Sequence, residues 1–265
     1  TAHEIAALGA RVALVGRDID KLKTVQAEIR DSGGDATWHS IDIRDEDGVR
    51  ATVAEILEQH SRIDGLVNNA GGQFPAKLKD ISMNGWEAVV KSNLTGGFLM
   101  SREVYTQWME KNGGNIVNIT ADFWQGMPDM GHSGAARAGM DNFTKTAAIE
   151  WAHSGVRVNS VSPGWIASSG FNKYPDWMTE RLRSLPNYVP VGRYGTEAEL
   201  SSAVVYLLSP AAAYISGESI RVDGAAPLMR EHRRHEDDGV MTPEFQGFHL
   251  YEKPNALSED WKKED

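Results

Sequence analysis

Short runs of β-branched residues alternate along most of this chain with longer segments of helical periodicity. One helical segment starts near Asp18, which can cap it, and stops at Gly33 and Gly34. Another runs from Asp45 towards His60. The predicted strands read RVALVG, ATWHSID, RIDGLVNN, GNIVNIT, VRVNSVSP and ESIRVDG. This alternation is typical of a parallel sheet covered by helices on both faces, so we expect a single-domain, doubly wound α/β fold.

The sequence begins in an unusual way for such a fold. The stretch TAHEIAALGARVALVGRD reads as the second half of a helix that runs into a strand. A dinucleotide-binding α/β fold needs an earlier strand and a Gly-rich turn, whose backbone amides hold the pyrophosphate. That first strand lies in the middle of the sheet, and without it each unpaired buried backbone group costs roughly 1–3 kcal/mol. We therefore expect the working protein to carry about 15–20 further N-terminal residues.

The composition excludes several classes of function. The net charge of −10 argues against a nucleic-acid-binding surface, and the absence of cysteine excludes disulfides and thiolate chemistry. No apolar run is long enough to span a membrane. A length of 265 residues with 41% hydrophobic residues suits one soluble domain with an extension.

Several motifs follow one another in a characteristic order. They read LVNNAGG, KSNLTGGF with Asn93, NIVNIT ending in Thr120, HSGAARAGMDNFTK and RVNSVSPGWIASS. Their order and spacing resemble the short-chain dehydrogenase/reductase family over residues 1–224, with 225–265 as a C-terminal extension. The longer stretches are most similar to the branch of trans-2-enoyl-CoA and 2,4-dienoyl-CoA reductases. The resemblance implies a Rossmann-like fold and an NAD(P)-dependent oxidoreductase.

The resemblance also implies how the cofactor is held. NAD-preferring members usually place an acidic residue where this chain has Gly16, and the next residue is Arg17, which favours the 2′-phosphate of NADPH. The alternative is that Arg17 only covers the loop surface. The other positions expected to line the adenine, ribose and nicotinamide are Asp42, Ile43, Asn69, Ala70, Gly71, Pro163, Gly164, Ile166 and Ser168.

The catalytic helix departs from the family pattern. Most members carry a tyrosine that protonates a carbonyl oxygen and, four residues later, a lysine that supports it. Ser133 and Arg137 occupy these positions here, with Asn93 and Thr120 completing the expected catalytic set. A serine hydroxyl is a poor acid but can donate a hydrogen bond to an enolate oxygen, while Arg137 can hold the ribose. The change therefore favours an NADPH-dependent reductase of 2-enoyl thioesters such as acyl-CoA over a ketoreductase.

Other readings of this helix stay open. Asp141 and Lys145 repeat the four-residue step, and an Arg137–Asp141 ion pair would be a purely structural alternative. Asp122 or His132 would be the proton donor to the α-carbon, although a histidine beside a helix start is more often a surface residue or a cap.

The stretch from Gly164 to Thr196 is long and rich in aromatic residues, as a substrate lid would be. Its aromatics form either an acyl slot or a small core under the loop, namely Trp165, Phe171, Tyr174 and Trp177. Arg181 and Arg183 either meet the phosphates of coenzyme A or lie on a solvated helix face.

The extension carries an arm with Phe245, Phe248, Tyr251 and Trp261, which we expect to cover a neighbouring subunit or to be exchanged with it. Its histidines beside Glu236 fit no defined metal-ligand set, so we predict no metal site. We expect a homo-oligomer, a tetramer by analogy with the family. Because the chain does not end in a Ser-Lys-Leu type of address, we expect a cytoplasmic location. A ketoreductase or alcohol dehydrogenase, and a catalytically silent binding subunit, are the alternative functions.

Overall fold

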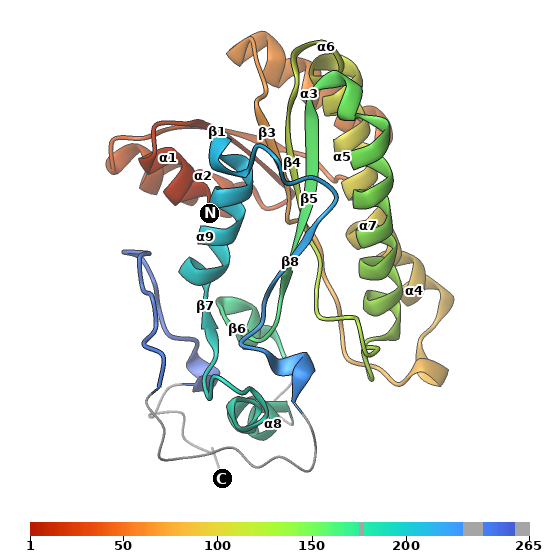
Figure 1. The fold of residues 1–265 in the computed structure, drawn as a ribbon, viewed down its shortest axis with the longest axis vertical. Coiled ribbons are helices and arrows are strands. Elements are labelled where there is room, and N and C mark those ends of the chain that lie inside the picture. The colour runs from red at the N-terminus through yellow and green to blue at the C-terminus, as the bar shows by residue number, and fades with distance from the viewer. Residues whose placement is uncertain (175–177, 230–240, 258–265) are drawn as a thin grey trace.

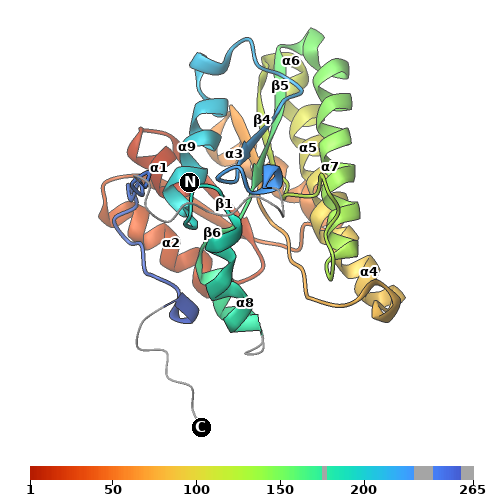
Figure 2. The same ribbon diagram turned by 60° about the horizontal axis from the view of Figure 1, so that its bottom comes forward.

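The computed structural model describes residues 1–174, 178–229 and 241–257 as a parallel sheet with helices on both faces (Figure 1). The predicted residues Trp177, Glu236 and Trp261 lie outside the described residues. Figures 1 and 2 both place α5 and α7 on one side of β4 and β5, and α9 on the other. The doubly wound α/β prediction is therefore confirmed. No helix among the described residues is long and apolar enough to cross a bilayer.

The strands of the sheet follow the predicted segments closely. Their bounds are β1 (Arg11–Gly16), β2 (Asp35–Ser40), β3 (Gly65–Asn68), β4 (Gly114–Ile119), β5 (Val156–Pro163) and β8 (Ser219–Val222). β1 pairs with β2, and a four-stranded sheet has the order β3-β4-β5-β8, with every pair parallel. The carboxyl ends of parallel strands share one edge, so the loops that follow them gather there.

No hydrogen-bonded ladder joins β1 to β3 among the described residues. β1 and β3 are also only partly buried, whereas four consecutive residues of β4 are buried. A strand order of 3-2-1-4-5-6 puts the first strand between these two edges. The additional N-terminal strand stays a prediction, and this is the position in which it would pair.

Two helices begin next to the residues that the sequence predicts, Asp18 and Asp45, and the first of them ends at Asp31, two residues before Gly33. Asp18 accepts a hydrogen bond from the Lys21 amide at 3.2 Å and so caps the helix after β1. Two π-turns, at Lys91–Thr95 and Tyr105–Met109, interrupt one long helix after β3. The helices are α1 (Ala2–Ala7), α2 (Ile19–Asp31), α3 (Glu46–His60), α4 (Met83–Val90), α5 (Gly96–Val104), α6 (Glu110–Asn112), α7 (Gly131–Glu150), α8 (Thr179–Ser184) and α9 (Glu197–Leu208).

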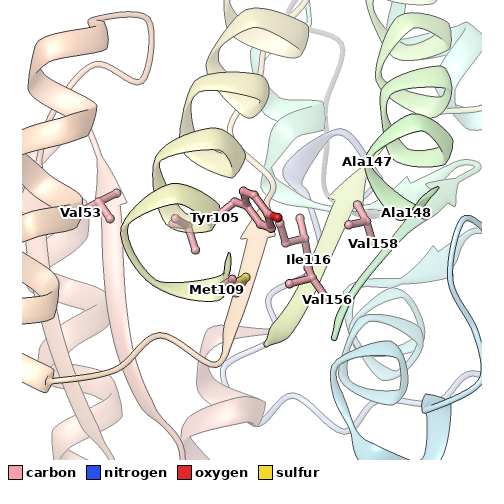
Figure 3. Close-up of a cluster of buried hydrophobic side chains, with 9 residues drawn as sticks. Val53, Tyr105, Met109, Ile116, Ala147, Ala148, Val156 and Val158 are labelled. Atoms are coloured by element: carbon pink, nitrogen blue, oxygen red, sulfur yellow. The ribbon is translucent and has the colours of Figure 1, made fainter. Parts of the chain in front are cut away.

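A buried apolar cluster fixes α7 and the long helix against the sheet (Figure 3). Ile116 and Val158 on neighbouring strands are fully buried beneath it. Tyr105 stacks on Trp151 with ring centroids 4.3 Å apart, and the Tyr105 hydroxyl lies 2.9 Å from Ser154 Oγ. Burial of aromatic and aliphatic side chains is the main stabilising contribution here, so this cluster determines where the two site-bearing helices lie.

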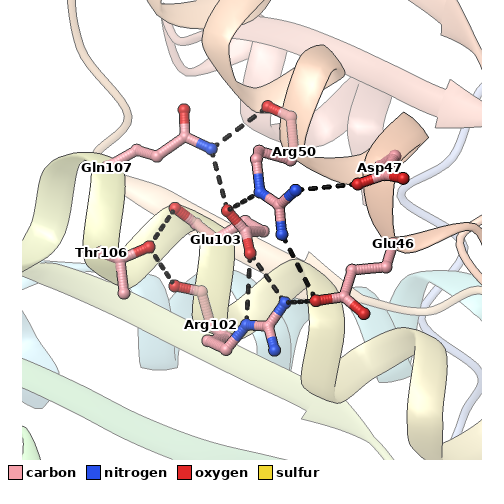
Figure 4. Close-up of polar contacts among 7 residues, drawn as sticks. All are labelled: Glu46, Asp47, Arg50, Arg102, Glu103, Thr106 and Gln107. Carbon is pink, nitrogen blue, oxygen red and sulfur yellow. Dashed lines mark hydrogen bonds and ion pairs between the residues drawn. The ribbon is translucent and has the colours of Figure 1, made fainter.

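A polar cluster joins α3 to the end of α5 (Figure 4). The buried Glu103 carboxylate accepts hydrogen bonds from Arg102 at 2.8 Å and Gln107 at 3.1 Å. Arg102 also donates to Glu46 of α3 at 2.6 Å. These contacts offset the cost of burying the Glu103 charge and hold the two helices in register.

The stretch from Gly164 to Thr196, called the lid below, lies at the carboxyl edge of the sheet. Its described part contains β6 (Ile166–Ala167), β7 (Gly195–Thr196) and α8. Phe171, Leu182 and Tyr194 form a small core there, with Ala256 of the C-terminal extension buried among them. Phe171 therefore belongs to a small core under the loop, which is one of the two alternatives that the sequence left open.

The described part of the extension packs on its own chain. The Arg193 guanidinium donates to the backbone oxygens of Thr242 at 3.0 Å and Pro243 at 3.1 Å. The phenyl ring of Phe248 lies 5.0 Å from the ring of His3. Coverage of a neighbouring subunit by this arm stays a prediction.

Candidate active site

A cleft of about 220 Å³ lies at the carboxyl edge of the sheet. Its lining joins the loops after β1, β2 and β3 to the helix that follows β3, and comprises Arg17, Arg44, Gly71, Gly72, Gln73, Phe74, Ala88, Val89 and Ser92. Ligands of open α/β sheets bind at this edge, where loops from several strands converge. Arg17 and Gly71, both predicted to bind the cofactor, therefore lie in one cleft.

Two arginines flank Asp42 at one end of the cleft. Arg44 donates to Asp42 Oδ1 at 2.9 Å, and Arg17 Nη1 lies 4.0 Å from Asp42 Oδ2. The side-chain hydrogen bonds from Arg44 lower the pKa of Asp42 to about 2, with a smaller contribution from the charge of Arg17. Asp42 thus remains ionised and orients Arg44, a residue that the sequence interpretation missed. The signal in the sequence is its position two residues after Asp42, in the loop that follows β2.

The remaining predicted cofactor positions lie along the same edge. Asn69 and Ala70 are exposed just after β3, and a Cβ on Gly96 would lie 2.4 Å from Ile43 Cδ1, so Ile43 packs on the long helix. Pro163 ends β5. Ser168 Oγ accepts a hydrogen bond from the Gly170 amide at 3.3 Å and caps the next turn.

The residues after Pro163 also lie very close to the chain that follows β8. A Cβ on Gly164 would lie 2.7 Å from Asp223 Cα, so only glycine allows this close approach of backbones. Ile166 starts β6 and pairs with Gly195 of β7. The turn after β5 is thereby fixed on both sides.

Asn93 braces the loop after β3. Its Nδ2 donates to the Gly72 carbonyl at 2.7 Å, and its Oδ1 accepts from the Gly72 amide at 3.0 Å. Asn93 is buried inside the π-turn at Lys91–Thr95, where the extra residue aims this amide at the loop. Its side chain therefore positions the loop, and its role in the predicted catalytic set stays a prediction.

Arg137 lies on the face of α7 that meets the same loop. Its Nη1 donates to the Ile119 carbonyl at 2.5 Å, and burial lowers the pKa of the guanidinium to about 10. Among the described residues no carboxylate forms an ion pair with it. The alternative Arg137–Asp141 pair is wrong, because Asp141 instead accepts from Lys145 at 2.6 Å, one helical turn further on.

Ser133 joins a hydrogen-bonded chain that runs to the lid. The Ser133 hydroxyl is fully buried and donates to Gln73 Oε1 at 2.7 Å. Gln73 Nε2 in turn donates to the Tyr174 hydroxyl at 3.0 Å. Neither Gln73 nor Tyr174 belongs to the predicted catalytic set. No local pattern reveals the pair, because these two residues come from loops far apart in the sequence.

His132 and Thr120 are two further residues that the sequence singled out, and both are buried. His132 is fully buried and contacts the ring of Phe74 edge-on, so it is not a surface residue. Close packing beneath Phe74 is the physical reason. The Nδ1 of His132 accepts the Ser133 amide at 2.9 Å in the first turn of α7, so the alternative of a cap holds. The buried Thr120 hydroxyl donates to the Val161 carbonyl at 3.3 Å, within the sheet.

Asp122 follows β4 at the same edge. Burial raises the pKa of its carboxyl, and the neighbouring Asp223 raises it further, while Arg221 opposes the change. Burial and a like charge both disfavour the carboxylate, so Asp122 holds its proton to higher pH than an exposed aspartate. Its predicted role as a proton donor stays a prediction.

A small apolar cavity of about 40 Å³ adjoins the site on the lid side. Apolar side chains from the loops after β3 and β4 and from α8 and its two flanking residues form most of its wall, together with Trp165: Pro75, Pro128, Met130, Met178, Leu182 and Leu185. Arg181 lies at the rim and pairs with Asp129 at 3.4 Å. Arg183 instead donates to the Ala256 carbonyl at 3.3 Å.

The residues present fit a nicotinamide cofactor. The Arg137 guanidinium has no anionic partner among the described residues and lies against Gly71, whose lack of a side chain allows this close approach, so the site suits a polar, negatively charged ligand. The fold and this cleft define an NAD(P)-dependent oxidoreductase.

Comparison with known proteins gives the family. The family model described as "Enoyl-(Acyl carrier protein) reductase" matches residues 1–225. A probable 2,4-dienoyl-CoA reductase of Bacillus subtilis is 33% identical over 226 residues, which cover 84% of this chain and 89% of that protein. A 3-oxoacyl-[acyl-carrier-protein] reductase of Synechocystis is 37% identical, with 84% of this chain and 90% of that protein covered.

The solved structure of the citronellol catabolism dehydrogenase AtuB of Pseudomonas aeruginosa superimposes with a TM-score of 0.76 and 54% identity. The superposition covers 85% of this chain and 87% of that one. The chain belongs to the short-chain dehydrogenase/reductase family, and its relatives include dienoyl-CoA reductases.

Proposed function

We propose that the protein uses NADPH to reduce the carbon–carbon double bond of a 2-enoyl thioester such as a 2-enoyl-CoA. The observation that carries the proposal is the part-buried hydrogen bond from Ser133 to Gln73, at the helix position where most of the family has a tyrosine. A serine hydroxyl and an amide are donors of hydrogen bonds, not acids. Such a site suits a reaction in which charge has to be stabilised on an oxygen before any proton is transferred.

The chemistry of an enoyl thioester makes that demand. When bound, NADPH supplies the hydride that adds to the β-carbon. The negative charge then develops on the thioester oxygen as an enolate. Gln73 has a second amide hydrogen beyond the one given to Tyr174, and the Ser133 hydroxyl can rotate from Gln73 to the substrate oxygen. The Gln73 amide is held in place before the reaction by Ser133 and Tyr174, so its reorganisation costs little in the transition state.

The preference for NADPH rests on Arg17 and Arg44. Both line the cleft, and the ionised Asp42 between them holds the second guanidinium in place. A pair of guanidinium groups matches a phosphate better than the neutral ribose hydroxyls of NADH. Arg137 lies against Gly71, a residue of the cleft lining, where its fixed positive charge suits the nicotinamide ribose.

Reduction of a ketone, or oxidation of an alcohol, is the second candidate function. It is supported by the raised pKa of Asp122, which would provide an acid in place of the missing tyrosine, and by the names of the Synechocystis and Pseudomonas relatives. A binding subunit without catalytic activity is the remaining alternative. We also propose a homotetramer and a cytoplasmic location, which light scattering and cell fractionation would test.

Consumption of NADPH with a trans-2-enoyl-CoA and, separately, a 3-ketoacyl-CoA tests the proposed function. We expect turnover on the enoyl thioester and a decrease of about 100-fold in kcat for Ser133→Ala, because a preorganised donor is lost. Ser202→Ala is the matched control, since its hydroxyl donates to the Ala198 carbonyl within α9 at 2.9 Å, away from the cleft. Turnover on the keto compound alone would overturn the proposal, and NADPH binding without turnover would favour a binding subunit.

Replacement of both cleft arginines tests the cofactor preference. We expect Arg17→Ala with Arg44→Ala to raise the KM for NADPH by at least about tenfold and leave the KM for NADH within about twofold, because each charged hydrogen bond contributes roughly 1.5–3 kcal/mol. Arg62→Ala is the control, since Arg62 pairs with Asp64 outside the cleft. Equal losses for the two cofactors would contradict this assignment.

A further inference from the structure

The lid places a tyrosine at the site, although the catalytic helix α7 has none. Tyr174 follows the turn at Ser169–Lys173, and its ring packs on the lid core that contains Phe171. Its hydroxyl reaches across to Gln73 at 3.0 Å, a residue of the cleft 101 positions earlier in the chain. The ring is thus anchored on the lid while its polar end belongs to the site.

The direction of the hydrogen bonds leaves Tyr174 with a free donor. Ser133 donates to Gln73 Oε1, which turns Gln73 Nε2 towards Tyr174, and Nε2 donates to the phenolic oxygen. The phenolic hydrogen is then available for a bound substrate. A donor that points at the phenolic oxygen also stabilises the negative charge left there after the proton has gone.

We propose that Tyr174 is the general acid that completes the reaction. The proposal deepens the proposed reduction of an enoyl thioester. After hydride addition to the β-carbon, the enolate electron pair forms the new C–H bond at the α-carbon with the hydroxyl proton of Tyr174. The O–H bond of Tyr174 breaks, and its oxygen keeps the bonding pair as a phenolate held by Gln73. Tyr174 is only half-buried, so water restores its proton.

The lid position explains how a phenol can replace the family tyrosine without occupying its place on α7. Ser133 acts in this step as a positioning residue, because it fixes which end of the Gln73 amide faces Tyr174.

Tyr174→Phe tests the proposal with the full chain, NADPH and a trans-2-methyl-2-enoyl-CoA, whose α-carbon becomes a stereocentre on protonation. We expect kcat to fall by at least about 100-fold and the product to change from one enantiomer to a mixture, because water replaces a fixed acid. The ring remains in the lid core in this variant, so folding is preserved. Gln73→Leu should give a smaller loss of kcat. Tyr188→Phe, on the same lid but exposed, should match the wild type.

Wild-type kcat and a single enantiomer in Tyr174→Phe would overturn the proposal. If the wild type turns over a 3-ketoacyl-CoA instead, the proposed function fails, and the same variants are compared on that substrate. A loss of about 100-fold there would still support the acid role, with an alkoxide as the acceptor, whereas no loss would overturn it.

Discussion

Gly71→Ala is expected to destabilise the protein by about 1–3 kcal/mol and to abolish cofactor binding. A Cβ at this position would lie 2.3 Å from Asn93 Oδ1 and 2.6 Å from Arg137 Nη2. Neither side chain can yield easily, because Asn93 is bonded to both backbone groups of Gly72 and Arg137 to the Ile119 carbonyl. The methyl group would force them apart and displace the loop after β3.

Gly72→Ala is the matched control, because a Cβ there would meet no heavy atom within 4 Å. Neither glycine has a positive φ, so the two substitutions differ in steric contact and not in backbone strain. Thermal unfolding and NADPH titration of both variants check the prediction. Equal stability of Gly71→Ala and Gly72→Ala would show that the Asn93–Arg137 contact does not restrict this loop.

Arg137→Met is expected to keep or raise the stability of the free protein by up to about 2 kcal/mol while removing its stabilisation by NADPH. Burial lowers the pKa of Arg137 to about 10, which corresponds to an unfavourable free energy of roughly 3 kcal/mol for its charge. Methionine fills similar space without a charge, and the loss of the hydrogen bond to Ile119 takes away part of the gain. Melting temperatures with and without NADPH measure both effects.

Arg157→Met provides the comparison for Arg137→Met. Burial also lowers the pKa of Arg157, but this side chain donates to the carbonyls of Leu207 at 2.9 Å, Ser209 at 3.2 Å and Ile215 at 3.3 Å, away from the cleft. We expect Arg157→Met to lower stability, because three carbonyls lose a donor, and to leave the NADPH response intact. A strong loss of stability in Arg137→Met alone would mean that its charge supports the fold and not the ligand.

The sequence predicted the elements that depend on local patterns. The predicted strand VRVNSVSP coincides with β5, and Asp18 caps α2 as expected. The four-residue step also predicted that Ser133 and Arg137 share one face of α7. Both side chains reach the loop after β3, the first through Gln73 and the second beside Gly71.

Predictions about which side chains interact with one another were less successful. The alternative Arg137–Asp141 pair is wrong, because Lys145 bonds to Asp141 and Arg137 bonds to the Ile119 carbonyl. His132 is not a surface residue, because it packs against Phe74. Arg44 was missed, although it follows the predicted Asp42 by two residues. A helix-spacing rule gives the candidate partners of a side chain, and packing against other elements selects among them.

The sequence by itself determined the α/β alternation, the family and the replacement of the usual tyrosine and lysine by Ser133 and Arg137. These properties follow from local periodicity and from residue identity at fixed spacing. Only the tertiary structure decided that Ser133 bonds to Gln73, and Gln73 to Tyr174 across 101 residues. The physical reason is that parallel strands deliver all their carboxyl ends to one edge, so residues with no relation in sequence meet there through the order of the strands.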